Sequence, residues 1–346
     1  MIRIGIVGCN YGRSVHVPAF RSDPRCTVIG LAGSDLARTT AAAQAVNIPL
    51  AWGNWTELVE HPDVDAVTIA APPSLQPAIA VRALELGKPV FAEKPIAADL
   101  AAAEAMARAA AASGQPTMVD FNFSAILTWR RAKALLDEGV IGRLRHVVVS
   151  WNVENYATRM RIMNWKSLGE NGGGVLGNFV SHSFSYLEWL CGPIIGMSAR
   201  LSGLPDEPMT ETNAHINLAF RSGAAGNLAV SCASFLGSGH RLEFYGEDGT
   251  MMLVNETPDY MRGFKLSLAR RSVGVMTPIE VVDPTDLNFP ADGRVAPVSR
   301  LATEFLNAIQ SGQPAVPGFA EGLRVQVLLD AARRASNVGC WLDLAT

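Results

Sequence analysis

The sequence has little charge and no excess of either sign. Only 18% of its 346 residues are charged, and 29 basic against 32 acidic residues give a formal net charge of −3. Without a basic excess the chain has nothing to neutralise a phosphate backbone, which argues against nucleic acid as a partner. The hydrophobic share of 49% excludes a disordered protein, and the low share of charged residues predicts apolar surface that another subunit covers.

Cysteines are few, and no long uninterrupted apolar segment occurs. The five cysteines form no C-x-x-C pair, so the sequence indicates neither a disulfide framework nor a zinc site, and a reducing cytoplasm fits. No basic N-terminal segment precedes an apolar core, so no signal peptide is expected. The longest uncharged stretch, 222–239, contains four glycines and predicts paired strands rather than a membrane span.

The first 120 residues alternate short apolar strands with helices, which predicts a doubly wound parallel sheet and a dinucleotide-binding domain at residues 1–120. The expected strands are Ile2–Val7, Thr27–Ala32, Val64–Ala70, Pro89–Ala92 and Thr117–Asp120.

Residues 121–346 show a different rhythm and predict an α+β domain with a large, mostly antiparallel open sheet for substrate binding and oligomerisation. A helix is expected at about 175–190, and two more at 299–310 and 320–336, the last packing back toward the N-terminal domain. The expected strands are Arg145–Val153, Met197–Ser202, Ala214–Arg221, Gly226–Ala233, Leu242–Tyr245, Met251–Val254 and Phe264–Ala269.

A glycine turn follows the first strand and opens the first helix. Gly8, Asn10, Tyr11 and Gly12 occupy the place where a dinucleotide pyrophosphate approaches the backbone and the helix N-terminus. The G-x-G-x-x-G string is imperfect, and we expect Asn10 to supply a positive φ where the second glycine is missing. The alternative is a tight strand-to-helix turn with no ligand.

The end of the second strand bears on the choice of cofactor. Gly33 stands where an acid commonly holds the ribose hydroxyls, with Ser34 next and Arg38 one turn later. A small residue, a hydroxyl and a cation suit a 2′-phosphate, so NADP is favoured over NAD. Two alternatives stay open: Asp35 is the ribose acid, or Ser34 is only a helix N-cap.

The segment Glu93-Lys94-Pro95 closes the fourth strand, at the edge where open parallel sheets bind ligands. The chain has only five lysines, and one fixed between a carboxylate and a proline suits the stabilisation of a developing alkoxide. The alternative is a surface ion pair beside a turn proline.

Asn178 and His182 follow a glycine run and lie four residues apart on one expected helix face. Histidine is the side chain best suited to taking a proton near neutral pH. The alternative is a satisfied polar residue at a helix–sheet interface. The other five histidines lack this setting.

Together these motifs resemble the glucose–fructose oxidoreductase / inositol dehydrogenase family over essentially the whole chain. The most specific piece is Glu93-Lys94-Pro95, supported by the glycine turn, by His16-Val17-Pro18-Ala19-Phe20 and by the 172–182 segment. The resemblance implies a Rossmann domain, a nicotinamide cofactor and the reversible oxidation of a secondary alcohol on a sugar, cyclitol or nucleotide sugar. It implies that Lys94 is the catalytic lysine and His182 the acid/base.

Three departures from the family pattern stand out. Asn178 replaces an aspartate four residues before the histidine, Ser185 stands near the place of another aspartate, and Gln76 replaces a histidine after the proline pair. The first weakens the expected base, and the second removes a usual ligand of a substrate hydroxyl. The substrate is therefore expected to differ from a common inositol or free hexose.

The sequence thus predicts an NAD(P)-dependent sugar or polyol dehydrogenase. Asn178 is expected to orient the substrate or the imidazole, and the rest of the cofactor site is expected at Ala71, Pro72, Gln76 and Glu93. Four further residues are expected to line the substrate pocket: Asn122, Tyr156, Arg161 and Trp165.

Two other interpretations remain for the sequence. One is a non-catalytic regulator of the same fold that binds sugar and dinucleotide, and the other is hydrolysis through a transient redox step. Retention of both Lys94 and His182 speaks against the regulator. A homodimer or homotetramer through the second sheet is expected, with no nucleic acid, membrane or metal involved.

Overall fold

The computed structural model describes residues 1–204, 210–289 and 291–344. The chain forms two compact units. The first contains residues 1–122 and 285–326, and the second contains residues 123–284 and 327–346. No helix in the described part of the chain is long and apolar enough to cross a membrane.

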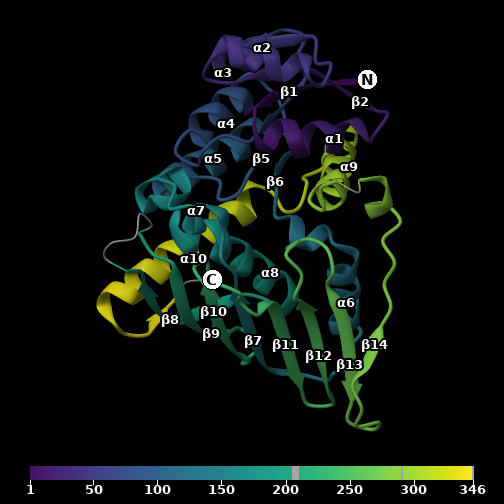
Figure 1. The fold of residues 1–346 in the computed structure, drawn as a ribbon, viewed down its shortest axis with the longest axis vertical. Helices are drawn as coiled ribbons and strands as arrows, with labels where there is room; N and C mark the ends of the chain where they lie inside the picture. The colour runs from purple at the N-terminus through teal and green to yellow at the C-terminus, as the bar shows by residue number, and fades with distance from the viewer. Residues whose placement is uncertain (205–209, 290, 345–346) are drawn as a thin grey trace. The chain divides into compact units, whose positions relative to one another are not determined.

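The first unit is built on a parallel sheet of six strands in the order β3-β2-β1-β4-β5-β6 (Figure 1). Every pair in it is parallel, and the order is that of the Rossmann fold, which confirms the predicted doubly wound sheet. The strands are β1 (Ile2–Val7), β2 (Cys26–Ala32), β3 (Leu50–Trp52), β4 (Ala66–Ile69), β5 (Val90–Ala92) and β6 (Thr117–Val119).

The helices of the first unit begin at recognisable caps. Asp35, Asn54 and Asp99 accept backbone N–H groups at the starts of α2, α3 and α5. The sequence analysis missed β3 and α3, because a strand of three half-buried residues leaves no periodic signal. The helices are η1 (Gly12–His16), α1 (Val17–Arg21), α2 (Leu36–Gln44), α3 (Trp55–Glu60), α4 (Gln76–Glu85) and α5 (Leu100–Ser113).

A segment from late in the chain completes the first unit. Figure 1 shows α9 (Val295–Ser311) beside α1, and Phe305 packs edge-on against Phe20 and Phe91 at ring distances of 6.4 and 5.8 Å. The expected division at residue 120 assigned this segment to the second domain. The sequence could not show that this segment packs in the first unit, because the ring contacts join residues that are more than 200 positions apart and leave no local pattern.

The second unit is built on a sheet of nine strands in the order β14-β13-β12-β11-β7-β10-β9-β8-β15. Among the described strands of this second sheet, only the pair β7–β10 is parallel, which confirms a mostly antiparallel sheet. The strands are β7 (Leu144–Asn152), β8 (Ile194–Ser202), β9 (Asn213–Phe220), β10 (Ala225–Ser231), β11 (Gly239–Gly246), β12 (Gly249–Asn255), β13 (Lys265–Arg270), β14 (Thr277–Ile279) and β15 (Leu342–Asp343).

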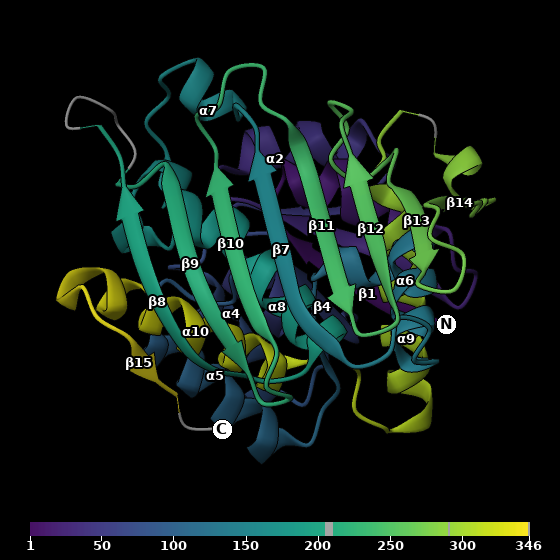
Figure 2. The same cartoon turned by 90° about the horizontal axis from the view of Figure 1, so that it is seen from below.

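One face of this sheet carries the core of the second unit. On β7, Val147, Val149 and Trp151 are buried, whereas the residues between them are half-buried. Figure 2 looks onto the opposite face, with α8 behind the strands. The helices of this unit include α6 (Leu127–Asp137), α7 (Tyr156–Arg159), η5 (Leu176–Val180) and α8 (Ser181–Cys191), and α10 (Phe319–Val338) has its first eight residues in the first unit and the rest in the second.

Candidate functional site

The glycine turn after β1 is shaped by one close backbone approach. Gly8 has φ +122°, and a Cβ there would lie 2.4 Å from the carbonyl oxygen of Ala70 at the end of β4. Only glycine fits at this position. We call the tight turn from Gly8 to Gly12 the glycine cradle, because a dinucleotide pyrophosphate binds at such a turn in Rossmann folds. Asn10 does not have the positive φ that we expected, because the unusual conformation falls on Gly8 and Asn10 already begins the helix by accepting Ser14 N–H at 3.0 Å.

The end of β2 has no room for the usual ribose acid. A Cβ on Gly33 would lie 2.5 Å from Thr39 Oγ1 and 2.7 Å from Cys9 Sγ. The cap of α2 is Asp35, whose Oδ1 accepts Arg38 N–H at 2.8 Å, so the alternative role of Ser34 as the cap is wrong. The side chains of Ser34 and Arg38 are exposed.

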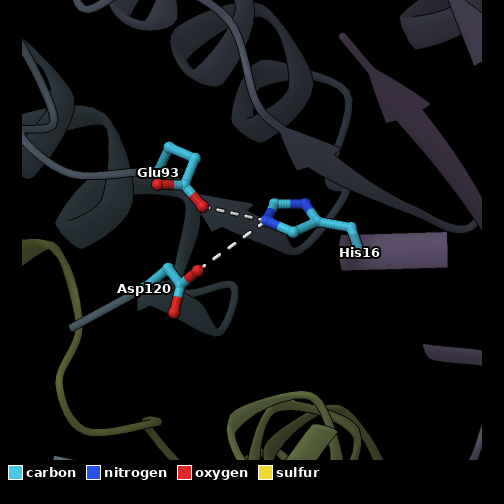
Figure 3. A group of neighbouring side chains, drawn as sticks. All are labelled: His16, Glu93 and Asp120. Atoms are coloured by element: carbon cyan, nitrogen blue, oxygen red, sulfur yellow. Dashed lines mark hydrogen bonds and ion pairs between the residues drawn. The ribbon is translucent and has the colours of Figure 1, made fainter. Parts of the chain in front are cut away.

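A buried cluster of three ionisable groups lies at the carboxyl edge of the parallel sheet (Figure 3). His16 comes from η1, Glu93 follows β5 and Asp120 follows β6. His16 Nε2 lies 3.0 Å from Glu93 Oε1 and 3.9 Å from Asp120 Oδ2. Its Nδ1 lies 3.3 Å from Thr68 Oγ1 on β4, so both ring nitrogens have an oxygen partner.

The charges in this cluster follow from burial and pairing. Burial lowers the pKa of His16, but the hydrogen bonds that its ring donates to Asp120 and Glu93 outweigh burial and raise the pKa to about 9. Burial opposes ionisation of Glu93 as well, but the hydrogen bond and charge of His16 lower its pKa. Burial and the neighbouring Glu93 raise the pKa of Asp120 to about 7. His16 is therefore an imidazolium paired with Glu93, and Asp120 is the group that titrates near neutrality.

Tyr11 connects this cluster to the segment that returns late in the chain. Its hydroxyl donates to Asp120 Oδ2 at 3.4 Å, and its ring meets His16 edge-on at 5.4 Å. The Arg294 guanidinium lies 5.1 Å from the centre of the Tyr11 ring, and Asp292 pairs with Arg294 at 2.6 Å. The side chain of Tyr11, a residue predicted to bind the cofactor, is therefore held by a hydrogen bond, a ring contact and a cation–π contact.

The turn that carries Lys94 is fixed on both sides. Glu93 N–H donates to the carbonyl of Ile69 at 2.9 Å. Beyond the lysine, the buried Gln76 side chain donates through Nε2 to the carbonyl of Pro95 at 2.9 Å. Lys94 itself is half-buried. The structure therefore brings Gln76, Glu93 and Lys94 together at one sheet edge.

Buried oxygens without a partner test whether this edge suits a nicotinamide cofactor. Gln76 Oε1, Asp120 Oδ1 and Asn122 Oδ1 are buried and accept no hydrogen bond within the described residues. Such orphaned acceptors need a donor that the chain does not supply. Together with the cradle at Gly8, they fit a ligand with N–H donors and a pyrophosphate. Ala71 and Pro72, also expected at the cofactor site, are half-buried between β4 and α4.

Asn178 and His182 lie in the second unit, at the junction of η5 and α8. The Asn178 amide donates through Nδ2 to the carbonyls of Lys166 at 2.9 Å and Gly174 at 2.7 Å. His182 is 4% exposed, and its ring meets Phe123 edge-on at 5.0 Å. An aspartate at position 178 would lose both donors and face two carbonyl oxygens, so an amide at this position has a structural reason.

The sequence analysis overlooked a second buried histidine in this unit. His240 on β11 stacks on Trp151 at 4.2 Å, and its Nε2 lies 3.0 Å from Tyr186 Oη. Burial lowers its pKa to about 3, so this ring is neutral. The sequence alone does not show this stacking, because it depends on the register of β7 against β11, which pairs Trp151 with His240.

The residues expected to line the substrate pocket come from both units. Asn122 is buried and belongs to the first unit, whereas the other three belong to the second. Tyr156 is 70% exposed on α7, and Arg161 has a positive φ of 50° in the loop that follows. Trp165 begins a short helix, with the Lys166 ammonium 5.6 Å from its ring.

The strand order, the glycine cradle and the lysine at the carboxyl edge define a Rossmann-type oxidoreductase. Residues 2–121 match the model of an oxidoreductase family with an NAD-binding Rossmann fold, and residues 129–252 match the GFO/IDH/MocA C-terminal domain. The chain belongs to this family of NAD-binding oxidoreductases, which confirms the resemblance drawn from its motifs.

Individual relatives span the whole chain. An uncharacterized oxidoreductase of Synechocystis sp. is 32% identical over 99% of this chain and 95% of its own length. Levoglucosan dehydrogenase of Pseudarthrobacter phenanthrenivorans is 24% identical over 99% of this chain and 98% of its own. Among solved structures, an oxidoreductase domain protein from Kribbella flavida superposes with a TM-score of 0.89 at 26% identity, covering 100% of both chains.

The buried cluster predicts how stability depends on pH. The pKa of His16 is raised in the folded state, so its stabilisation is complete below the unfolded value near 6.5 and is lost as the pH rises through about 9. Asp120, whose pKa is also raised, acts in the same direction around pH 7. We expect the free energy of unfolding to fall by on the order of 2 kcal/mol between about pH 6 and pH 9.

Urea denaturation at several pH values measures this fall, and His16→Gln should flatten it. His240 provides the contrast, because its lowered pKa destabilises the fold only as the pH falls below about 6.5. Parallel alkaline profiles for parent and His16→Gln would contradict the assignment of the effect to His16.

Proposed function

We propose that the protein is an NAD(P)-dependent dehydrogenase that interconverts a secondary alcohol and a ketone on a sugar, cyclitol or nucleotide sugar. The observation that carries this proposal is the fixed Glu93-Lys94-Pro95 turn at the carboxyl edge of a Rossmann sheet with a glycine cradle. Relatives support the substrate class, since levoglucosan dehydrogenase and inositol 2-dehydrogenase both match nearly the full chain.

Different residues of the chain would bind the cofactor, stabilise charge and transfer the proton. Gly8 and Gly12 let the turn after β1 pack closely on Ala70 and Ile6, and the backbone of this turn would meet the pyrophosphate. The unpartnered oxygens of Gln76 and Asn122 would accept N–H groups of the cofactor. The Lys94 ammonium would stabilise negative charge on the reacting oxygen. His182 would take the hydroxyl proton on a ring nitrogen during oxidation and return it during reduction. The nicotinamide, when bound, accepts or donates the hydride.

Of the two roles expected for Asn178, orienting the substrate or orienting the imidazole, its hydrogen bonds favour the second. Its amide hydrogens are committed to the carbonyls of Lys166 and Gly174, so it would act by holding the start of the helix that carries His182. The proposal therefore assigns it to positioning rather than to proton transfer.

A spectrophotometric screen tests the function. Reduction of NAD or NADP would be followed with a panel of anhydrosugars, aldoses, aldonic acids and inositols. Turnover of any of them supports a dehydrogenase. Binding of cofactor and sugar without turnover across the panel would favour the regulator instead.

Lys94→Ala tests the central residue. Loss of one preorganised charge at a developing alkoxide costs about 3 kcal/mol, or about a hundredfold in kcat. The dissociation constant of the cofactor should change little, because the glycine cradle remains. Lys265→Ala, at an exposed strand position, is the matched control and should leave kcat at the parent value. Near-normal turnover of Lys94→Ala would reduce Lys94 to a surface charge.

The preference for NADP over NAD rests on the end of β2. Position 33 cannot hold an acid without displacing Thr39 and Cys9, so no carboxylate at that position repels a 2′-phosphate. Arg38 is exposed one turn into α2, where a guanidinium can pair with a phosphate. Asp35 is committed through Oδ1 to capping the same helix.

Arg38→Ala should weaken NADP binding by about tenfold or more and leave NAD binding nearly unchanged, since a charge-assisted hydrogen bond contributes roughly 1.5–3 kcal/mol. Fluorescence titration with both reduced cofactors measures the two constants. Arg108→Ala, with its side chain 70% exposed on α5, controls for the lost charge. Equal losses for both cofactors, or a parent that prefers NAD, would point to Asp35 as the ribose ligand.

The open face of the second sheet supports a homo-oligomer. Paired positions place Asn217, Asn227, Val148, Glu243 and Met252 in one row across five strands on this face. Such a mixed row suits contact with a second copy of the chain. The five cysteines, none in a disulfide, support a reducing compartment such as the cytoplasm.

Light scattering at micromolar concentration should give a mass of two or four chains. Val148→Glu would place a second carboxylate directly beside Glu243 in the row and should shift the mass toward one chain. Arg108→Glu, whose side chain is 70% exposed on α5 and outside this sheet, controls for altered charge. A parent mass of a single chain would refute the assembly.

A further inference from the structure

The motif His16-Val17-Pro18-Ala19-Phe20 has no role in the function proposed above, and its histidine is fully buried. A buried imidazolium is costly, because a charge taken out of water must be paired to be tolerated. The ring spans the carboxyl ends of the parallel strands, from Thr68 on β4 to Glu93 after β5. Because the ring lies directly beside the turn that carries Lys94, a function at that turn would explain why a charged ring is buried here.

We propose that His16 is a positioning residue that holds Lys94 in place through Glu93. The significance of this role for catalysis rests on the proposed function, but the contact itself does not.

The first step of the argument is that the ring is itself immobile. Phe91 and Tyr11 meet it edge-on at 5.3 and 5.4 Å, and Phe20 lies 6.5 Å away. Its two nitrogens contact oxygens of Thr68 on β4 and of Glu93 after β5, so rotation of the ring would break both contacts at once. A ring held in this way is a fixed donor rather than a mobile one.

The second step is that this donor fixes the residue next to the lysine. Glu93 is held by its side chain through His16 Nε2 and by its backbone N–H through Ile69. On the far side, Gln76 holds the carbonyl of Pro95. Lys94 is thus bracketed by residues that are each tied to the sheet edge, which limits the positions available to its ammonium.

The third step concerns the charges that face the ring. Glu93 and Asp120 provide negative charge, Tyr11 donates to Asp120, and Arg294 lies over the Tyr11 ring. Lys94 adds a positive charge that favours ionised Glu93. The positive charge of the protonated ring offsets the repulsion between the Glu93 and Asp120 carboxylates at this edge.

Two substitutions separate this role from simple packing. Asparagine places its amide nitrogen near the Nδ1 position of histidine, and glutamine places it near Nε2. His16→Gln therefore keeps a donor for Glu93, whereas His16→Asn keeps only the contact toward Thr68. His16→Phe keeps the ring contacts and loses both donors.

Competitive acetylation with acetic anhydride, read by mass spectrometry, measures the freedom of each lysine without any substrate. The chain has only five lysines, and exposed Lys265 serves as the internal reference. Relative to Lys265, we expect acetylation of Lys94 to rise at least about threefold in His16→Asn and His16→Phe, because the turn is released. His16→Gln should stay near the parent rate.

A destabilised control excludes a general effect. Leu58→Ala removes a fully buried side chain of α3 that lies against Gly5, away from the carboxyl edge. It should lower stability and leave the Lys94 rate unchanged. Should His16→Phe and His16→Asn fail to fold, Glu93→Gln provides the test, since it keeps the size of the side chain and removes the ion pair, and it should also raise the Lys94 rate.

Nitrogen NMR of the parent gives a second measurement. The His16 ring should show both nitrogens protonated at about pH 8, whereas His240 should be neutral there. Unchanged Lys94 rates in the folded His16→Asn and His16→Phe variants, or a neutral His16 at that pH, would overturn the proposal. A failed substrate screen with altered Lys94 rates would reject the proposed function and leave the positioning role standing.

Discussion

The ion pair between His16 and Glu93 is the contact on which the candidate site depends. It joins the helix after β1 to the turn after β5, and Asp120 brings in the end of β6. Desolvation offsets much of the attraction in a buried pair, so only part of that attraction remains as the stability that is lost at alkaline pH. The effect of the pair is geometric: strands that would otherwise end independently are fixed to one another at the edge where a ligand binds.

Much of the fold follows from local patterns in the sequence. Strands such as β1 and β7 are continuous or alternating apolar runs, and all of the residues expected in these two strands except Val153 lie in them. Lys94 stood out because a proline, a strand end and a scarcity of lysines coincide at one place. The location of Glu93, Lys94 and Gln76 at one sheet edge could be predicted because the carboxyl ends of parallel strands lie at the same edge.

The rest depended on partners that are far away in the sequence. His16 and Asp120 are more than a hundred residues apart, and nothing near either one in the sequence indicates that they lie in one cluster. Asn178 was assigned to the chemistry by its spacing from His182, but its amide is bound to backbone carbonyls that only the folded loop brings near. Short elements such as β3 were missed because three residues show no period.

The return of residues 285–326 to the first unit has a consequence for synthesis of the chain. Phe305 closes the ring cluster with Phe20 and Phe91, so the nucleotide-binding unit lacks part of its core until almost nine-tenths of the chain has been made. The strands of that unit leave the ribosome first but wait for their last helix. The second unit is made in between, and its sheet from β7 to β14 is complete in sequence before the first unit is.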